Sequence, residues 1–205
     1  MILVVAAVSK ELDWLNSRAG VEVLITGVGP VDAAARVSKA LTQAHYDVVI
    51  NAGIAGAMPG VAKVGDSVVI GEEMLALEQE NGEPISLPQG NVLANRCPSD
   101  AALTEMITSL GFPLVRGITV THVTSNDATA MQLHSRGAEV ESMEGFAVLR
   151  AAQLAGVPAV ELRGISNIVG DRRNSGWDFE AGMGGLRRIL NAALDLLHTS
   201  PANAE

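Results

Sequence analysis

The chain has 205 residues, 48% of them apolar and only 3% aromatic, and its formal net charge is −9. This length fits one domain with a full hydrophobic core, and the acidic balance disfavours nucleic-acid binding, which needs basic patches. No apolar run is long enough to span a membrane, and the apolar start lacks the basic region of a signal peptide. The single cysteine, Cys97, excludes an internal disulfide and is typical of a reducing compartment. We therefore expect a cytoplasmic protein that binds neither membrane nor nucleic acid.

The first 30 residues predict two strands, each followed by a turn into a helix. Residues 2–8 form a continuous apolar run, which is typical of a strand buried on both faces. Ser9 is a candidate N-cap, so Glu11 falls in the first turn of a short helix, just past the end of the strand. An acid there either serves chemistry or simply interacts with the helix dipole. Residues 21–26 predict a second strand, and Pro30 suits the first position of the helix that follows.

The rest of the chain alternates between strands and helices in the same way. A strand that starts at Asp47 is expected to run into a glycine-rich loop, where Gly53 lets a ligand or another strand approach closely. Residues 78–98 are polar and rich in turn-forming residues, which predicts a long loop. Further strands are expected at 64–70, 114–123, 139–143 and 158–165, and helices near Asp100, Ser125 or Asn126, Glu144 and Asp178. Residues 1–198 are expected to form one domain, with 199–205 as a frayed tail.

Residues 158–177 place a charge where a buried strand is expected. Arg163 lies among apolar strand residues, and a charge buried in a sheet is costly unless it is paired. Ser166 and Asn167 follow at the C-terminal end of this strand, where open α/β sheets bind ligands. Two interpretations remain open. Either Arg163 pairs with a core carboxylate beside an ordinary turn, or these residues hold a polar small molecule.

Several stretches of the chain, taken together and in order, resemble a known group of enzymes. They are residues 6–12, 26–34, 51–56, and 142–145 with 163–167. The set resembles the purine nucleosidase and phosphorylase superfamily, of the methylthioadenosine/S-adenosylhomocysteine nucleosidase type, over nearly the whole chain. Within that group, the ending 163–172 followed by Trp177 looks most like the futalosine hydrolase family of menaquinone biosynthesis.

The resemblance implies a three-layer α/β fold, in which a central, mixed, twisted sheet is flanked by helices. It implies cleavage of an N-ribosidic bond of a small nucleoside through an oxocarbenium-like transition state, without a cofactor. The four histidines are scattered and lack the spacing of metal ligands, so no metal site is expected. The resemblance also implies a homo-oligomer, with a homodimer as the first expectation, to which the 78–98 loop can contribute.

The resemblance assigns roles around the ribose and the nucleophile. Glu11 matches the glutamate that orients and deprotonates the attacking water, and Arg163 matches the arginine of the same region. Glu144 matches the glutamate that accepts hydrogen bonds from the 2′ and 3′ hydroxyls, although an acid at a helix start is also ordinary. Met143 matches the methionine that packs against the sugar. The glycine-rich loop carries Ile54 and no arginine, which favours water over phosphate but departs from the usual nucleosidase pattern.

The leaving base is the part of the substrate on which the sequence is most informative. Asn167 stands where adenine-specific members of the group carry an aspartate. An amide NH₂ can donate to the N7 and O6 acceptors of a 6-oxopurine, which a carboxylate would repel. Asn167, supported by Ser166, therefore indicates hypoxanthine or guanine, and futalosine carries hypoxanthine. The backbone near Ser125 and Asn126 corresponds to the segment of the group that contacts the base.

Futalosine also bears a carboxyphenyl group beyond C5′. Arg172 suits its carboxylate and Trp177 suits its ring, whereas the plain alternative is a solvated surface loop. The expected function is hydrolysis of futalosine to hypoxanthine and dehypoxanthine futalosine. The alternatives are a methylthioadenosine/S-adenosylhomocysteine nucleosidase, a purine nucleoside phosphorylase and a nucleoside-binding module without chemistry. Glu11, Glu144 and Arg163 together disfavour the last, because a pure binder needs no water-activating acid.

Overall fold

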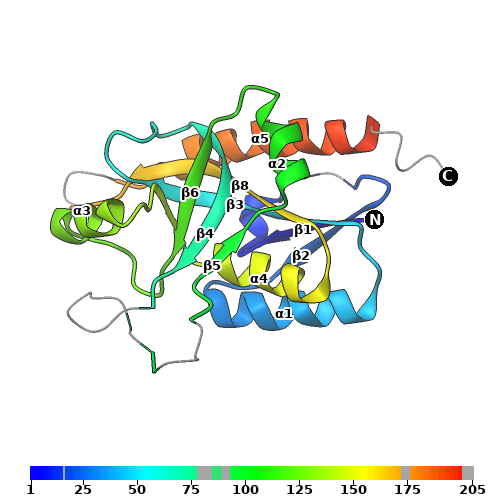
Figure 1. Ribbon diagram of the computed structural model, residues 1–205. Coiled ribbons are helices and arrows are strands. Elements are labelled where there is room, and N and C mark those ends of the chain that lie inside the picture. The colour runs from blue at the N-terminus through cyan, green and yellow to red at the C-terminus, as the bar shows by residue number, and fades with distance from the viewer. Residues whose placement is uncertain (16, 78–84, 86, 89–92, 172–175, 200–205) are drawn as a thin grey trace.

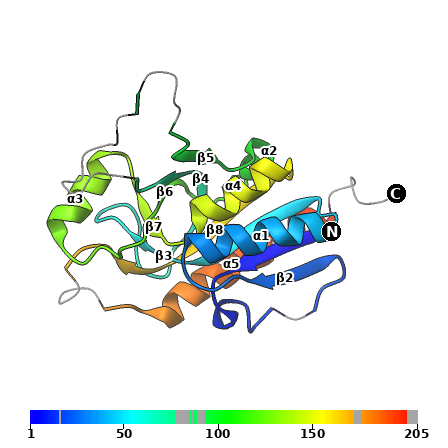
Figure 2. The same cartoon turned by 90° about the horizontal axis from the view of Figure 1, so that it is seen from below.

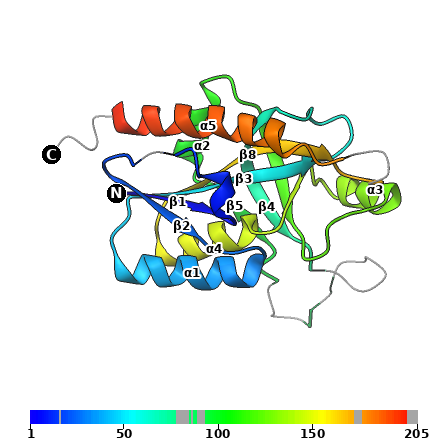
Figure 3. The same ribbon diagram turned by 180° about the vertical axis from the view of Figure 1, so that it is seen from behind.

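The computed structural model describes residues 1–15, 17–77, 85, 87–88, 93–171 and 176–199. Its centre is a mixed sheet of eight strands between two layers of helices, which confirms the expected fold class (Figure 1). The helices are α1 (Pro30–Gln43), α2 (Ala101–Thr108), α3 (Asp127–Ser135), α4 (Gly145–Ala155) and α5 (Phe179–Thr199). Helices α1 and α4 cover one face, α2 and α5 cover the other, and α3 lies at one end (Figures 2 and 3). None of the described helices is long and apolar enough to cross a membrane.

Strand β1 (Ile2–Ala6) shows why the chain begins with an unbroken apolar run. Successive side chains of a strand point to opposite faces. Leu3 and Val5 pack in one core cluster with α1 and α4, and the even-numbered residues pack in another cluster with α2 and α5. A strand that is covered on both sides has no solvated face, so its sequence shows no polar alternation.

The other strands extend the sheet and close part of it into a ring. They are β2 (Val21–Ile25), β3 (Val48–Ala57), β4 (Ser67–Leu75), β5 (Arg96–Pro98), β6 (Leu114–Thr119), β7 (Val140–Ser142) and β8 (Ala159–Ile168). The order along the sheet is β2-β1-β3-β7-β6-β4-β5, and β8 pairs with both β3 and β4. The pairings β3–β8, β8–β4, β4–β6, β6–β7 and β7–β3 therefore form a closed ring of five strands.

Small and branched side chains from all five strands of the ring pack together. This cluster contains Ala55, Ala57, Val68, Ile70, Val115, Val140 and Ile165. Because side chains alternate along β8, Glu161 and Arg163 share the face of Ile165. The ring therefore holds a buried charged pair beside its apolar core.

Several strand boundaries differ from the expectations; for example, β4 ends at Leu75 and β8 at Ile168, later than expected. The segment around Gly53 and Gly56 continues β3 and is not a loop, because β8 pairs with β3 over nearly its whole length. A Cβ on Gly56 would lie 2.9 Å from the side-chain nitrogen of Asn167, so the glycine makes room for the neighbouring strand. Strand β6 ends at Thr119, earlier than expected, and β5 forms within the expected loop 78–98.

Helix starts follow the expected capping chemistry, with one correction. Three side chains accept hydrogen bonds from backbone N–H groups in the first turns of α2, α3 and α5; they are Asp100, Asn126 and Asp178. Ser9 is not an N-cap. The single 3₁₀ turn η1 (Ser9–Glu11) begins after Val8, whose backbone N–H donates to the Glu11 carboxylate. At the other end of the chain, α5 includes Thr199, which the sequence placed in the tail.

Candidate active site

A cavity of about 220 Å³ is lined by residues at or just after the C-terminal ends of β1, β7 and β8, where α/β proteins bind ligands, and by the second half of β3. Six residues that the sequence predicted line it: Glu11, Met143, Glu144, Ser166, Asn167 and Trp177. Arg163 and Gly53 are not among the lining residues, but both adjoin the Glu11 carboxylate from inside the ring of strands. Arg172 lies outside the described residues. The structure therefore brings most of the predicted site together.

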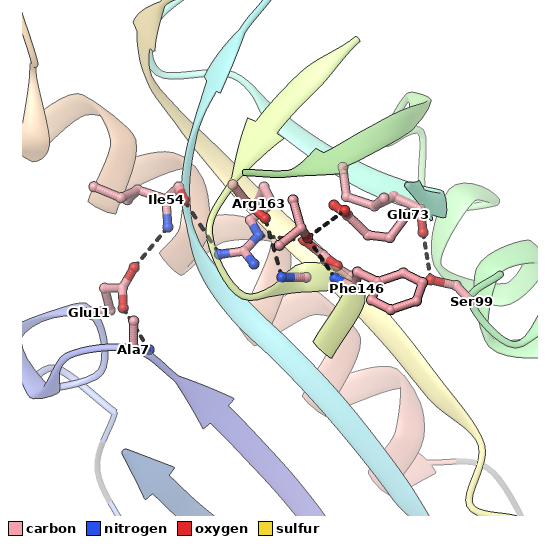
Figure 4. A network of polar contacts seen from close by, with 12 residues as sticks. Ala7, Glu11, Ile54, Glu73, Ser99, Phe146 and Arg163 are labelled. Atoms are coloured by element: carbon pink, nitrogen blue, oxygen red, sulfur yellow. Dashed lines mark hydrogen bonds and ion pairs between the residues drawn. The ribbon is translucent and has the colours of Figure 1, made fainter. Parts of the chain in front are cut away.

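Three backbone donors hold Glu11 at the cavity. Its Oε2 accepts hydrogen bonds from the N–H groups of Ala7 and Val8, both at 3.1 Å, and its Oε1 accepts one from Ile54 at 3.0 Å (Figure 4). The side chain is buried, yet it faces the cavity. The carboxylate bridges the end of β1 and the middle of β3, so its position is fixed by the sheet. A fixed acid beside a cavity meets the geometric requirement for a general base.

Arg163 lies behind Glu11 and is only 2% exposed. Its Nε donates to Glu161 Oε1 at 2.7 Å, and its Nη1 donates to the Ile54 carbonyl at 3.4 Å (Figure 4). Burial lowers the pKa of Arg163, but the negative charges of Glu161, Glu144 and Glu11 raise it by more. The net pKa is above the ordinary value, so the guanidinium stays charged. The first interpretation of Arg163 is confirmed in that it pairs with a core carboxylate, whereas its part in holding a small molecule stays a prediction.

Gly53 makes this arrangement possible. A Cβ at this position would lie 2.2 Å from Arg163 Nη1 and 2.9 Å from Glu11 Oε1, closer than these atoms tolerate. The missing side chain lets the guanidinium and the carboxylate converge on one point of β3. Gly53 thus makes room for two side chains behind the cavity. It does not line the cavity, although the sequence suggested that a ligand approaches it closely.

Glu144 is the N-cap residue of α4, but its carboxylate makes no capping bond to its own helix. Its Oε1 accepts a hydrogen bond from the backbone N–H of Gly29 at 2.8 Å. Burial raises the pKa of Glu144, although the Arg163 charge and the Gly29 bond oppose the rise. An ordinary helix-start acid would point at its own helix. This geometry therefore favours a carboxylate that serves the cavity, which Met143 also lines.

Ser166 fixes the orientation of the Asn167 amide. Its hydroxyl donates to Asn167 Oδ1 at 2.9 Å, a shorter contact than the 3.2 Å to the Ala55 carbonyl. Because Oδ1 is engaged, the NH₂ group is the part of the amide left to act as a donor. Both side chains line the cavity. The end of β8 thus presents a hydrogen-bond donor where a carboxylate would present only acceptors.

Trp177 and Phe179 form an aromatic pair at the edge of the cavity. Their ring centroids lie 5.1 Å apart at an interplanar angle of 75°, an edge-to-face arrangement. Each residue is 44% exposed although it lines the cavity. Sequence reasoning missed Phe179, because it reads as an ordinary first residue of α5. The pair offers apolar ring faces to a group that extends out of the cavity.

Ser125 and Asn126 are not among the described residues that line the cavity. Both are exposed, and Asn126 Oδ1 accepts the Thr129 N–H at 2.8 Å as the cap of α3. Val123 contributes to the cavity wall from this segment. In the segment that was expected to contact the base, the residue at the cavity is therefore Val123, two positions before Ser125.

Glu141 is a buried acid of the cavity wall that sequence reasoning missed. Its carboxylate accepts hydrogen bonds from the Thr124 backbone N–H at 3.1 Å and from the Thr124 hydroxyl. It thereby ties the segment after β6 to β7. A polar residue inside the short strand β7 was the available signal. Within the described part of the chain, no His, Cys, Asp or Glu side chains are grouped so that they could hold a metal ion.

Comparison with known proteins gives relatives along nearly the whole chain. The family model of the phosphorylase superfamily matches residues 15–199. A futalosine hydrolase from Thermus thermophilus is 34% identical over 182 residues, which are 83% of this chain and 80% of that protein. A futalosine hydrolase from Acidothermus cellulolyticus is 39% identical over 181 residues, which are 83% of this chain and 72% of that protein.

A solved nucleosidase structure shares the fold. The crystal structure of 5′-methylthioadenosine/S-adenosylhomocysteine nucleosidase from Neisseria meningitidis, in complex with methylthio-immucillin-A, superposes with a TM-score of 0.80. The match covers 94% of this chain and 97% of that one at 17% identity, so it concerns the fold alone. The family model and the sequence relatives decide the membership. The chain therefore belongs to the phosphorylase superfamily, in the group of nucleosidases that includes the futalosine hydrolases.

Proposed function

We propose that the protein hydrolyses the N-ribosidic bond of futalosine and releases hypoxanthine and dehypoxanthine futalosine, a step of menaquinone biosynthesis. One observation carries the choice of base. Ser166 engages Oδ1 of Asn167, so the NH₂ group can donate to the N7 and O6 acceptors of a 6-oxopurine. The sequence relatives named futalosine hydrolase support the same substrate.

Glu144 and Met143 hold the sugar in this proposal. The Glu144 carboxylate accepts hydrogen bonds from the ribose 2′ and 3′ hydroxyls, and Met143 packs against the ring. A hydrogen bond to a charged acceptor contributes about 1.5–3 kcal/mol. The same negative charge stabilises the cation that develops as the bond to the purine stretches, so it helps the transition state more than the ground state.

Glu11 supplies the base for the attacking water. It orients the water towards C1′ and takes its proton as the carbon–oxygen bond forms, which typically contributes about 10²–10⁴-fold. The electron pair of the broken bond leaves with the purine, and Asn167 stabilises that charge by donating a hydrogen bond. The purine then takes up one proton, which balances the proton that Glu11 removed. The permanently charged Arg163 lies behind Glu11 and Glu144 and attracts both carboxylates.

The cavity favours water over phosphate as the nucleophile. Its described lining residues include three acids, Glu11, Glu141 and Glu144, and no lysine or arginine. A phosphate dianion would meet negative charge at short range without a cationic partner. The Ile54 N–H is also already bonded to Glu11. These features support hydrolysis, and they disfavour a phosphorylase.

We infer further that the enzyme is a homodimer whose second copy covers the open side of the cavity. Val28 lines the cavity but is 59% exposed, and the nearby Val31 is 79% exposed. Exposed apolar side chains at the edge of a site suit a protein interface. Residues 1–198 act as one domain in this proposal. The buried, free Cys97 supports the cytoplasmic location that the sequence predicts.

The second candidate is a methylthioadenosine/S-adenosylhomocysteine nucleosidase, which the shared fold favours. It fits the base site less well. Adenine carries a 6-amino group, which is a donor, and the amide NH₂ of Asn167 cannot accept from it. The orientation that Ser166 imposes therefore favours the 6-oxopurine of futalosine.

One assay separates these functions. The purified protein is incubated with futalosine, inosine and methylthioadenosine, each with and without phosphate, and free purine is measured by chromatography. We expect hypoxanthine from futalosine without phosphate. Adenine as the main product, a requirement for phosphate, or no release from any nucleoside would each contradict the proposal.

A further inference from the structure

Of a buried polar network inside the ring of strands, only Arg163 has a part in the mechanism above. The network joins Glu73 on β4, Thr119 on β6, and Glu161 with Arg163 on β8; Glu73 and Arg163 are labelled in Figure 4. Glu73, Glu161 and Thr119 have no exposed surface, and none of the four lines the cavity. Burying two acids beside one arginine is expensive unless every charge and every polar atom is matched. The network therefore needs an explanation of its own.

The hydrogen bonds of the network leave three buried polar atoms without a partner, namely two carboxylate oxygens and Arg163 Nη2. Arg163 Nε donates to Glu161 Oε1 at 2.7 Å, and the Thr119 hydroxyl donates to Glu73 Oε2 at 2.8 Å. The same hydroxyl accepts the Phe146 N–H, in the first turn of α4, at 2.7 Å. The remaining oxygens, Glu73 Oε1 and Glu161 Oε2, are buried without a hydrogen-bond partner.

These two oxygens lie close to the same point beside Gly145. A Cβ on Gly145 would be 2.6 Å from Glu161 Oε2 and also 2.6 Å from Glu73 Oε1. A Cβ on Gly117 would be 1.9 Å from Glu73 Oε1, so two glycines from different elements leave room for the acids. Two ionised carboxylates cannot approach in this way without strong repulsion. A single proton between them satisfies both oxygens and leaves one negative charge to match Arg163.

We propose that Glu73 is a carboxylic acid that donates its proton to Glu161, and that the pair positions Arg163 against the reaction centre. This role rests on the proposed hydrolysis, because only that reaction makes the place of Arg163 matter. Glu161, bonded on both sides, cannot rotate away. Arg163 Nη1 is thereby kept at the Ile54 carbonyl, beside the Glu11 carboxylate.

The surrounding charges agree with one proton on Glu73. Burial and the negative charge of Glu161 raise the pKa of Glu73 well above its ordinary value of 4.5, and the Thr119 bond and Arg163 offset this only in part. Cys97 on β5 faces the pair as a neutral thiol, because burial raises its pKa to about 11. The charges of Glu11 and Glu144 act on Arg163, and the charge of Glu161 also acts on Glu144. Arg150 on α4 and Glu72 on β4 lie further out, near Cys97.

The first test of the pair needs no substrate. Infrared difference spectra of the protein in H₂O and D₂O at neutral pH report a buried, protonated carboxylic acid. We expect such a band in the unchanged chain and its loss in Glu73→Gln. A spectrum without the band, or a band that Glu73→Gln leaves in place, would overturn the proposal. Because no turnover is involved, this result stands whether or not futalosine is the substrate.

The second test separates positioning from mere packing. Glu73→Leu removes the donor to Glu161, so we expect kcat for futalosine to fall about tenfold, the usual scale of one lost bond to a charged group, with KM nearly unchanged. Glu73→Gln supplies an amide N–H to Glu161 and an amide oxygen to Thr119, so it should restore kcat to within about threefold. Equal losses in the two variants would overturn the proposal.

If Glu73→Leu does not fold, the pH dependence of the free energy of unfolding tests the proposal instead. The folded state holds a proton on Glu73 that the unfolded chain gives up near pH 4.5, so stability is lost as the pH rises from that value through the raised pKa. Glu73→Gln has no such proton, and its free energy of unfolding should fall less steeply over that range. Parallel profiles for the two proteins would overturn the proposal.

Discussion

The Glu144 carboxylate accepts a hydrogen bond from the backbone N–H of Gly29 at 2.8 Å, across 115 positions of the chain. Gly29 has φ of 103°, a conformation that favours glycine, and it is the N-cap residue of α1. The turn before α1 therefore holds the acid before α4. This bond sets the direction of Glu144 before any ligand arrives, and a preorganised charge of this kind is what stabilises a developing cation.

The first prediction concerns Glu144→Gln. The amide oxygen can still accept the Gly29 N–H, so the fold should persist, but the charge that faces the sugar is lost. We expect kcat/KM for futalosine to fall about 100-fold, as is typical when one electrostatic partner of a transition state is removed. Steady-state release of hypoxanthine measures this. Glu139→Gln is the matched control, because Glu139 pairs with Arg116 and does not line the cavity; equal losses in the two variants would contradict the role.

The raised pKa of Glu144 also predicts that activity and stability respond to pH in opposite directions. Burial raises its pKa above the ordinary value of 4.5. The reaction needs the ionised carboxylate, so kcat/KM falls as the pH is lowered through the raised pKa. Its contribution to stability is full below 4.5 and is lost as the pH rises through the raised pKa, because the folded state binds the proton more tightly.

Two pH profiles check this prediction, one of kcat/KM and one of the free energy of unfolding. In Glu144→Gln the pH dependence of the unfolding free energy that this carboxyl causes should disappear. The pH dependence that Glu73 causes should remain. Identical stability profiles for Glu144→Gln and the unchanged chain would show that the carboxyl of Glu144 titrates at its ordinary value.

The fold and part of the site were predictable because their signals are local. Apolar runs gave the strands, and Asn126 and Asp178 gave helix starts through their own side-chain bonds. Ring closure was not predictable, because it depends on β8 pairing with strands that lie far away in the sequence. Arg163 could be singled out as a costly charge, whereas its partner Glu161, two residues earlier in the same strand, was overlooked.

Gly53 shows where local interpretation of the site was wrong. A glycine-rich stretch after a strand reads as a ligand-binding loop, yet this one is the interior of β3. Its function becomes visible only when Arg163 and Glu11, from two other elements, are placed against it. Phe179 was missed in a related way, because nothing in its local sequence separates a cavity residue from the start of an ordinary helix.

The prediction for Gly53→Ala follows from that geometry. The added methyl group would overlap Arg163 Nη1 and crowd Glu11 Oε1, so both must move. We expect kcat to fall about 100-fold, because a misplaced base loses most of the benefit of general base catalysis. Gly184→Ala in α5 is the control, since its methyl group meets only the end of Arg188 at 3.9 Å and should stabilise the helix. A fully active Gly53→Ala would contradict the assigned roles of Glu11 and Arg163.

The base specificity should depend on Asn167. Asn167→Asp replaces the NH₂ donor by an acid, which can protonate N7 of adenine and accept from its 6-amino group. We expect the ratio of kcat/KM for methylthioadenosine to that for futalosine to rise at least about tenfold. Ser166→Ala frees the amide to rotate and should raise the ratio by less, through a loss on futalosine alone. An unchanged ratio in Asn167→Asp would remove the main support for a 6-oxopurine.

The aromatic pair Trp177 and Phe179 at the cavity edge is expected to hold the group that the substrate carries beyond C5′. Trp177→Leu removes the edge-to-face partner of Phe179 and one ring face at the opening. We expect KM for futalosine to rise about tenfold, the scale of one lost aromatic contact with its buried area, because futalosine carries a ring beyond C5′. Inosine ends at the C5′ hydroxyl, so its KM should not change. Phe179→Leu should act in the same sense, because the two rings support each other. A rise of equal size for both nucleosides would instead mean that Trp177 supports the sugar or the base, and the 5′ group would then need another binding element.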